Sequence, residues 1–177
     1  MEDIDSNVML KEKLLSAGID EIATYGTQNF SLRRVAAACG ASCAAPYKHF
    51  KNKEHFINEI ILYVEEKWLH LSNQILAVTD DPKERIAELC VANIRFKVGN
   101  PLFGVGKDCF DPVISKELSL FCQQNQYDYE EKLFVISALV TGTATLIVEG
   151  KMDSNPKTFR ILKTIVLNEL ENKAASL

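Results

Sequence analysis

Basic, hydroxyl and phenol side chains gather between Ile22 and Lys53, and such side chains can bind a polyanion. This stretch contains no acidic residue, and its basic residues are Arg33, Arg34, Lys48, Lys51 and Lys53. Residues 1–56 hold seven Lys/Arg and seven Asp/Glu, so the whole net charge of −4 lies downstream. Because salt screens charges beyond about 10 Å, a local cationic face matters more to a nucleic acid than a distant acidic region. By charge alone, a basic face that is simply solvated is an equally good interpretation.

No catalytic or metal-binding pattern competes with this interpretation. The sequence contains no GxSxG, glycine-rich phosphate loop, HExxH or paired-carboxylate motif, so we predict no catalytic residues and no enzyme activity. His55 and His70 form no metal-ligand spacing with His49. We therefore expect neither a metal site nor a cofactor.

Cysteine usage and the first residues indicate the cytoplasm. The five cysteines, at positions 39, 43, 90, 109 and 122, show no CxxC spacing, and an odd number fits reduced thiols better than a disulfide framework. The acidic segment Met1–Asp5 is unlike the basic start of a secretory signal. Leu133–Val148 is uncharged, but its sixteen residues are fewer than the roughly 20 that span a bilayer, so we expect no membrane partner.

The elements that position the basic stretch are all predicted to be helices. Apolar residues recur at helical spacing from Leu10 to Tyr25, where Gly26 ends the helix. Ser31 is a good N-cap for a helix that runs to Cys39. A short helix is predicted after the cap Ser42, and a long one from Lys53 to about Val78 after the cap Asn52. Two more are predicted near 82–98 after Asp81 and near 112–124 after Asp111, each with proline at its first position, and the last two over Tyr127–Gly150 and from Pro156 to near Lys173. A short helical piece is also predicted at 101–107, where Gly104 and Gly106 weaken it.

Ser31–Phe50 has the features of a helix-turn-helix. Ala36 is small where a partner helix must cross closely, and Gly40 supplies the positive φ that a helix end often needs. Residues 43–45, which are predicted to open the second helix, are small as well. The N-terminus of that helix can therefore enter a major groove without collision.

The stretch FSLRRVAAACGASCAAPYKHFKNKEHF resembles the DNA-binding domain of the tetracycline-repressor (TetR) family of transcription regulators. The likeness covers about residues 10–60, and its matching positions are Ser31, Val35, Ala36, Gly40, Ser42, Tyr47, His49, Phe50, Lys53 and Glu54. Downstream, ALVTGTATLIVEGK at 138–151 is similar to the helix that pairs subunits in this family. The resemblance implies an all-α fold of about nine helices, with a three-helix helix-turn-helix domain at 1–52 and a helical effector-binding and dimerisation domain at 53–177.

By position, the resemblance implies that Tyr47 and His49 contact phosphates and that Lys53 adds a charged contact. Ser31 would combine helix capping with a phosphate contact, and Arg33 matches a position that reaches bases in some members. The full set predicted to contact DNA is Ser31, Arg33, Ser42, Cys43, Ala44, Ala45, Tyr47, Lys48, His49 and Lys53. The alternatives are that Tyr47 packs against the domain and that His49 is an ordinary surface histidine.

The base-facing start of the second helix departs from many relatives. Cys43, Ala44 and Ala45 offer van der Waals contacts but few hydrogen bonds, so we expect base specificity to rest on Arg33, Lys48 and DNA shape. Cys43 is also predicted to lie at a helix N-terminus, where the dipole lowers the pKa of a thiol. A redox-responsive regulator is therefore one alternative, an inert thiol is another, and a helical interaction module without DNA binding is a third.

A helix-turn-helix protein commonly reads a pseudo-palindromic operator with two DNA-binding domains about 34 Å apart, so we expect a homodimer. The helices near 127–150 and 156–173 are its predicted interface. Small residues on the first and apolar residues on the second favour close packing: Ala138, Gly142, Thr143 and Ala144, then Ile161, Ile165, Leu167 and Leu170. The alternative is that both helices belong to the core of one subunit.

Aromatic residues lie between the DNA-binding domain and that interface: Trp68, Phe96, Phe103, Phe110, Phe121, Tyr127 and Tyr129. In the family, this region encloses an effector pocket, and an aromatic lining favours a small hydrophobic effector. Aromatic residues at helical spacing are more often plain core, so no single lining residue is predicted. The family's usual mode implies a repressor whose effector favours a conformation that mismatches the operator.

Overall fold

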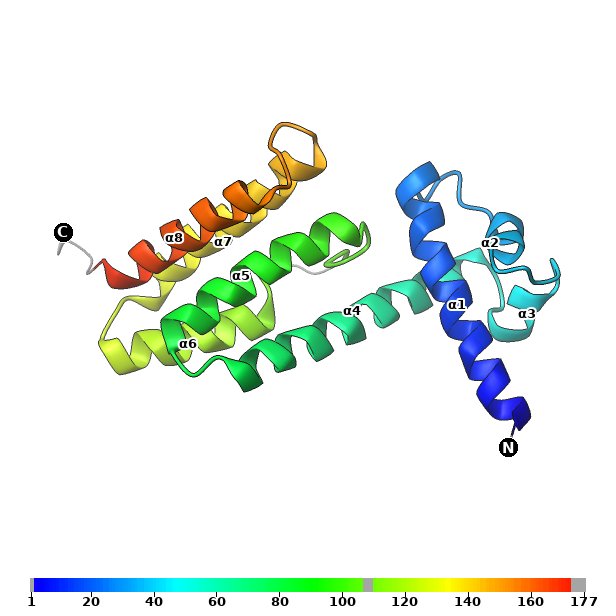
Figure 1. Ribbon diagram of the computed structural model, residues 1–177, viewed down its shortest axis with the longest axis horizontal. Coiled ribbons are helices and arrows are strands. Elements are labelled where there is room, and N and C mark those ends of the chain that lie inside the picture. The colour runs from blue at the N-terminus through cyan, green and yellow to red at the C-terminus, as the bar shows by residue number, and fades with distance from the viewer. Residues whose placement is uncertain (1, 107–109, 173–177) are drawn as a thin grey trace. The chain divides into compact units, whose positions relative to one another are not determined.

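The computed structural model describes residues 2–106 and 110–172, with side chains from Val8 onward, and every regular element in these residues is a helix. The helices are α1 (Glu2–Tyr25), α2 (Leu32–Ala38), α3 (Ala45–His49), α4 (Lys53–Val78), α5 (Pro82–Gly99), α6 (Pro112–Asn125), α7 (Tyr129–Val148) and α8 (Pro156–Glu171) (Figure 1). The all-α prediction is confirmed.

The predicted number of about nine helices is reduced to eight in the described residues. The short piece predicted at 101–107 forms turns instead of a helix as far as Gly106. Gly104 and Gly106 have φ angles of +77° and +78°, a left-handed conformation that a right-handed helix does not contain. Residue 107, Cys109 and Lys173, which also entered the predictions, lie outside the described residues.

Local capping explains where most helices begin. Ser31 caps α2 as predicted, with its Oγ accepting from the Arg34 N–H at 3.4 Å. Asn52, Asp81 and Asp111 accept backbone hydrogen bonds of 2.8 to 3.1 Å at the starts of α4, α5 and α6. These hydrogen bonds confirm the predicted caps. Such caps can be predicted because each depends only on residues within the same turn.

The prediction that Ser42 caps the second helix of the motif is wrong. The helix α3 begins at Ala45, and its N-cap residue Ala44 makes no side-chain hydrogen bond. Ser42 contributes only its carbonyl, which accepts from the Ala45 N–H at 2.9 Å. Pro46 sits at the start of α3, where its fixed φ and missing N–H are tolerated, and this places the helix start later than Ser42 implies.

The described residues form two compact units. The first, which we call the head, runs to Lys67 and includes Asn100–Val105; the second, the body, contains Trp68–Gly99 and the described residues from Gly106 onward. This division differs from the predicted boundary between residues 52 and 53. The reason is that the first part of α4 buries one face, with Phe56, Ile60 and Val64 four residues apart, in the core of the head.

Three phenylalanines hold the head together. The ring centres of Phe50 and Phe56 lie 4.3 Å apart with an edge-on geometry, and those of Phe30 and Phe56 lie 5.4 Å apart. Gly18 of α1 permits this packing, because a Cβ there would lie 2.5 Å from Cε1 of Phe56. Phe50 belongs to the core of the head, since only 1% of it is exposed.

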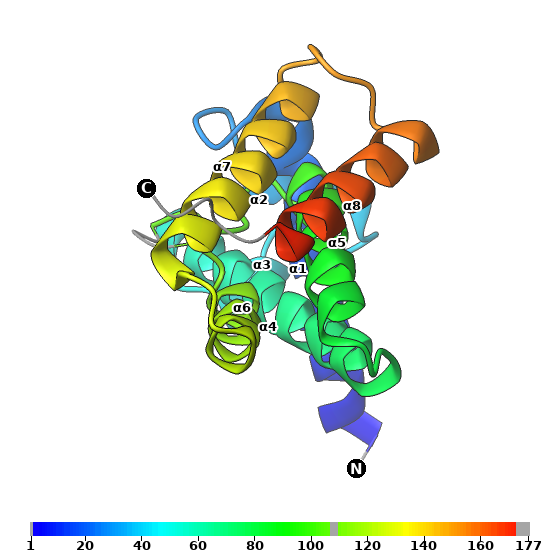
Figure 2. The same cartoon turned by 90° about the vertical axis from the view of Figure 1, so that its left-hand side faces the viewer.

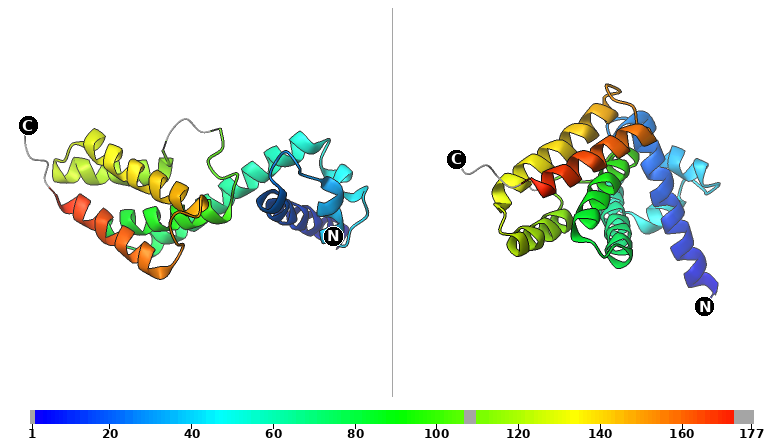
Figure 3. Two further views of the ribbon diagram at one scale, coloured as in Figure 1. Left: turned by 90° about the horizontal axis from the view of Figure 1, so that it is seen from above. Right: turned by 60° about the vertical axis from the view of Figure 1, so that its left-hand side comes forward.

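The body is a helical bundle built around α5, which packs against α6, α7 and α8. Figures 2 and 3 show α7 and α8 side by side, joined by a loop at one end. The core of the body is mainly aliphatic, with Ile86, Leu89, Ile114, Ile136 and Leu162 almost fully buried. By length and composition alone, α7 is apolar enough to cross a membrane, with a mean hydropathy of 1.6. In the body, α7 packs against α5, α6 and α8, and 33% of its apolar window is buried.

A buried lysine joins the start of α7 to the end of α8. The Nζ of Lys132 donates to the carbonyl and to Oε1 of Glu169, at 2.7 and 2.8 Å, and to the carbonyl of Asn172 at 2.8 Å. Only 1% of Lys132 is exposed. All three ammonium donors are therefore satisfied, which is the condition for burying such a charge.

Candidate nucleic-acid interface

A tight turn joins α2 to α3 in the head. Gly40, with a φ of +64°, follows the end of α2 and donates its N–H to the carbonyl of Ala37 at 3.0 Å. The Ala41 N–H donates to the carbonyl of Ala36 at 2.9 Å and completes the closure of the helix end. Ala36 is fully buried, as expected where helices cross closely. The helix, turn and second helix therefore occur in the predicted order.

Most of the residues predicted to contact DNA lie on the surface of the head. The exposed members of the set are Arg33, Ser42, Cys43, Ala44, Tyr47 and Lys48. Tyr47 is the most informative, because 61% of it is exposed beside a well-packed core. A tyrosine that packed against the head would be covered, so the packing alternative for Tyr47 is not supported.

Ala45 departs from the predicted set. Only 7% of it is exposed, and it is buried together with Pro46 at the start of α3. Cys43 and Ala44 remain exposed but belong to the turn before the helix. The assignment of Ala45 to the base-facing surface is therefore corrected, and the helical part of α3 presents Tyr47 and Lys48 instead.

Lys53 is held at the first residue of α4 by the head itself. Its Nζ donates to the carbonyl of Gln28 at 3.2 Å and lies 5.9 Å from the ring centre of Phe30. An ammonium has three donors, so this one bond leaves donors for a phosphate. The half-exposed position, at the N-terminus of a long helix, also suits an anion.

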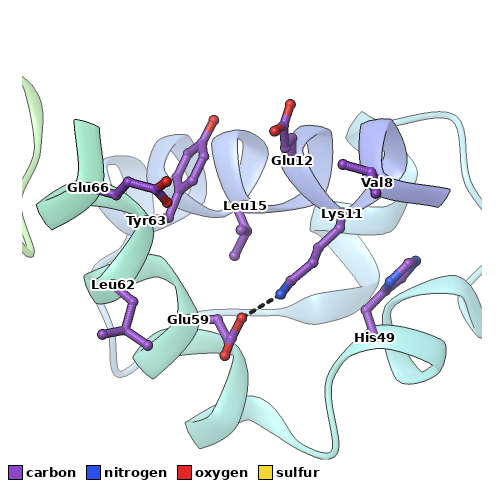
Figure 4. A pocket seen from close by; sticks show the side chains of 9 residues that line it. All are labelled: Val8, Lys11, Glu12, Leu15, His49, Glu59, Leu62, Tyr63 and Glu66. Carbon is purple, nitrogen blue, oxygen red and sulfur yellow. Dashed lines mark ion pairs between the residues drawn. The ribbon is translucent and has the colours of Figure 1, made fainter. Parts of the chain in front are cut away.

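His49 lines a groove of about 380 Å³ between α1 and α4 of the head (Figure 4). Across the groove, Lys11 Nζ lies 2.7 Å from Glu59 Oε2, and the hydrogen bond from Lys11 lowers the pKa of the Glu59 carboxyl. In the described part of the chain, Nε2 of His49 is buried without a hydrogen-bond partner. A phosphate contact by His49 therefore needs Nδ1 or a rotation of the ring.

Two residues at this interface were not predicted as a pair. Arg34 was counted with the basic face, but its guanidinium forms an ion pair with Glu21 of α1. Glu21 also accepts a hydrogen bond from the Ser31 N–H at 3.1 Å. Glu21 and Arg34 belong to different helices, so no local sequence pattern predicts their contact.

The described cysteines differ sharply in exposure. Cys43 is exposed, whereas Cys90 and Cys122 are buried and Cys39 is partly covered, with its Sγ donating to the carbonyl of Lys13 at 3.4 Å. Burial raises the pKa of Cys39, Cys90 and Cys122. Cys43 lies two residues before α3 rather than at its start, so the expected helix-dipole effect on this thiol loses its geometric basis.

The predicted dimer surface on α7 and α8 is only partly exposed. Thr143, Ala144 and Leu170 are buried in the body, so their assignment to an interface is corrected. The members that face outward are Ala138, Gly142, Ile161 and Ile165. Phe134 of α7, which was not predicted, joins them with 74% of its surface exposed.

The aromatic residues named in the sequence analysis are divided between the two units. Phe103 is buried in the head, within the segment Asn100–Val105. In the body, the rings of Trp68 and Phe96 lie 5.5 Å apart, and those of Phe121 and Tyr127 lie 5.7 Å apart. Trp68 and Phe121, one member of each ring pair, are buried.

Comparisons with known proteins agree with this geometry. Residues 14–60 match the family model of bacterial regulatory proteins, tetR family. The nucleoid occlusion factor SlmA of Vibrio campbellii is 26% identical over 165 residues, which are 91% of this chain and 80% of that protein. The sequence match to the family model thus falls on the part of the chain that carries α2, α3 and the exposed face.

Solved structures extend the likeness in fold to the whole chain. A TetR family transcription regulator from Marinobacter aquaeolei VT8 has a TM-score of 0.66 at 14% identity, covering 96% of this chain and 98% of that one. The transcriptional regulator FadR from Bacillus subtilis, in complex with stearoyl-CoA, has a TM-score of 0.67 at 16% identity, covering 90% and 96%.

Proposed function

We propose that this chain, a DNA-binding transcriptional regulator with a tetR-family domain at residues 14–60, is a cytoplasmic homodimeric repressor that binds a pseudo-palindromic operator. A small hydrophobic effector bound by the body releases it from DNA. The observation that carries the proposal is the exposed face of α2 and α3, where Tyr47, Lys48 and Arg33 project from the head.

Each exposed residue has a role that its chemistry supports. Tyr47 and His49 donate to phosphates at the groove edge, and Lys53 adds a charged contact at the start of α4. Arg33 and Lys48 reach base edges, since a guanidinium binds guanine O6 and N7 in a bidentate way. The contact surface is completed by the half-exposed Ser31 and by the exposed Ser42, Cys43 and Ala44.

DNA binding is tested by enriching duplexes from a randomised library with the wild-type protein and measuring electrophoretic shifts of the enriched duplex. We expect Tyr47→Phe, His49→Ala and Lys53→Ala each to weaken the shift and the triple variant to abolish it. Lys116→Ala, which removes one exposed charge from the body, should shift like the wild type. A fully active triple variant would refute these roles. A wild type that enriches no duplex would favour the interaction module without DNA binding.

Dimer formation is supported by an apolar surface on two neighbouring helices. On α7, Phe134, Ala138 and Gly142 recur four residues apart, and all are exposed. On α8, Ile161 and Ile165 have the same spacing, with 50% and 44% of their surfaces exposed. A glycine and an alanine between large apolar residues allow two helices to approach closely, so we assign this surface to a four-helix interface with a second copy.

The dimer is tested by light scattering on the full chain. Ile165→Glu places a charge on the proposed interface and should shift the mass toward the monomer. Leu120→Glu makes the same kind of change on α6, where 44% of Leu120 is exposed, and should leave the mass unchanged. A dimer that tolerates Ile165→Glu and is broken by Leu120→Glu would move the interface to α6.

The effector is proposed from the aromatic ring pairs of the body and from the likeness in fold to a regulator in complex with stearoyl-CoA. We use stearoyl-CoA as the probe and coenzyme A as the matched control without an acyl chain. A hydrophobic effector site predicts a higher unfolding temperature and release from the duplex with stearoyl-CoA only. Equal effects of both compounds would point to the nucleotide instead of the chain.

Cys43 provides a second candidate for regulation because it is the one exposed cysteine of the four in the described residues. Since it lies outside the helix that was expected to activate it, we propose that it is inert toward the DNA-binding activity. Peroxide should leave the electrophoretic shift unchanged. A loss that Cys43→Ser prevents would establish the redox-responsive alternative.

A further inference from the structure

Glu21 is a buried acid of the head that faces the start of α2. Only 8% of it is exposed, and its Oε1 accepts hydrogen bonds from the Ser31 N–H at 3.1 Å and from Arg34 Nε at 2.8 Å. Arg34 Nη2 donates to the same oxygen. Such partners replace the water that a buried carboxylate loses, and they offset the cost of burying its charge. One oxygen atom of α1 thus binds both the residue that caps α2 and the third residue of that helix.

The guanidinium of Arg34 binds groups of the head, while 47% of its side chain stays exposed. Besides Glu21, it donates through Nη2 to the carbonyl of Asn29, and its guanidinium carbon lies 4.4 Å from the ring centre of Tyr25. The guanidinium is a planar fork of five donors, so partners on several sides fix its direction as well as its position. The side chain that leaves α2 at residue 34 therefore has one orientation.

That orientation determines where the neighbouring residues point. Consecutive residues of an α-helix point about 100° apart, so holding Arg34 against α1 directs Arg33 away from α1. Arg33 is exposed accordingly. The Oγ of Ser31 accepts the Arg34 N–H at 3.4 Å, which leaves the hydroxyl proton of Ser31 available for an external acceptor.

We propose that Glu21 and Arg34 are positioning residues for DNA binding. The buried carboxylate holds the N-terminus and the rotation of α2, and thereby presents the Ser31 hydroxyl and the Arg33 guanidinium to the duplex. This inference rests on the proposed DNA-binding function of the head and adds two residues that do not themselves touch DNA.

A positioning role for Glu21 and a simple effect of its charge predict opposite changes in DNA affinity. Removing the negative charge of Glu21 makes the net charge of the head more positive. Electrostatics alone therefore predicts that the variant binds a polyanion more tightly. A positioning role predicts the opposite, because the neutral amide oxygen of a glutamine accepts from Arg34 and from the Ser31 N–H more weakly than the carboxylate does. Asp20 supplies the matched control: it is the preceding residue of α1, it carries the same charge, and it is exposed.

The test measures the affinity of the full chain for the duplex enriched by the wild type, over a series of salt concentrations. We expect Glu21→Gln to weaken binding roughly tenfold, about the loss of one good contact, while Asp20→Asn binds as well as the wild type or better. Arg34→Lys keeps the charge but loses the fork, and should weaken binding with the salt slope unchanged. A residue that touches phosphate would instead change that slope by about one when its charge is removed, as in Arg34→Gln.

The outcomes separate the alternatives. Tighter binding by Glu21→Gln, or wild-type binding by Arg34→Lys together with a reduced salt slope for Arg34→Gln, overturns the proposal and makes Arg34 a direct phosphate contact. Circular dichroism melting checks that each variant is folded. If Glu21→Gln unfolds the head, the salt slopes of the Arg34 variants decide the question. A wild type that enriches no duplex contradicts DNA binding itself, which is a different failure from a head that binds DNA without needing Glu21.

Discussion

The head and the body each expose a surface that the packing of their own unit does not need, and the two surfaces differ in chemistry. On the head, α2 and α3 expose basic, hydroxyl and phenol groups, among them Arg33, Lys48 and Tyr47. On the body, α7 and α8 expose Phe134 and Ile165 beside small residues. The first surface suits an ionic, hydrated partner, whereas the second suits a partner that removes apolar area from water.

The two units also bury charge differently. In the head, Glu21 is buried against Arg34 directly beside the proposed DNA face. In the body, Lys132 is buried against Glu169 where α7 meets the end of α8. In the head the acid is buried and its partner Arg34 is half-exposed, whereas in the body the lysine is buried and Glu169 is largely covered. We assign the first pair to the orientation of α2 and the second to the stability of the bundle.

The largest expected difference between the two surfaces is the effect of salt on the binding that each one mediates. If Arg33, Lys48 and Lys53 of the two heads together release the counterions of six phosphates, affinity for the enriched duplex should fall about a thousandfold between roughly 50 and 200 mM salt. The apolar interface should keep the dimer mass constant over that range. Fluorescence anisotropy and light scattering in the same buffers check both statements. Salt-insensitive DNA binding, or a dimer that dissociates in salt, would contradict the comparison.

Removing the buried lysine should destabilise the body. Lys132→Met keeps the length of the side chain but leaves Glu169 Oε1 and two carbonyls without their donor, so we expect a loss of about 3 kcal/mol in unfolding free energy. Urea denaturation followed by the fluorescence of Trp68, the single tryptophan of the chain, measures it. The control Lys116→Met, on the exposed side of α6, should change little. Equal stabilities of the two variants would show that the Lys132 bonds contribute nothing.

Two glycines inside helices compare the units directly. Gly18→Ala in the head puts a Cβ 2.5 Å from a Phe56 ring atom, and such overpacking should cost about 1–3 kcal/mol of stability. Gly142→Ala in the body meets nothing within 4 Å, so helix propensity should stabilise the subunit by about 1 kcal/mol. Thermal unfolding measures both changes. If α7 pairs two subunits, Gly142→Ala should also weaken the dimer, and an unweakened dimer would place Gly142 outside the interface.

The ion pair across the head groove should give the smallest effect. Hydrogen bonding from Lys11 lowers the pKa of Glu59 below its ordinary value, so the pair adds stability above the pKa of an unfolded glutamate, about 4.3. That contribution is lost as the pH falls through the lower, folded pKa. Lys11→Gln should therefore melt slightly earlier than the wild type at neutral pH and equally in strong acid. A difference that persists in acid would assign the effect to packing, not charge.

Local chemistry explains which parts of the fold and site could be predicted. The caps Ser31, Asn52, Asp81 and Asp111 act within one helical turn, so the helix starts follow from neighbouring residues. The cap predicted at Ser42 failed although it is equally suitable by type, because Pro46 moved the start of α3. The exposed part of the site was predictable for a similar reason, since Tyr47 and Lys48 follow a short, recognisable turn.

The sequence by itself determined an all-helical chain, a helix-turn-helix between residues 31 and 50, and most of the exposed residues on that motif. Only the tertiary structure decided that Ala45 is buried, that Arg34 pairs with Glu21, and that Thr143, Ala144 and Leu170 belong to the body core. The physical reason is the range of the interactions. Capping and periodicity act over one or two helical turns. The burial of a side chain depends instead on which distant helix packs against it, and the neighbouring residues do not identify that helix.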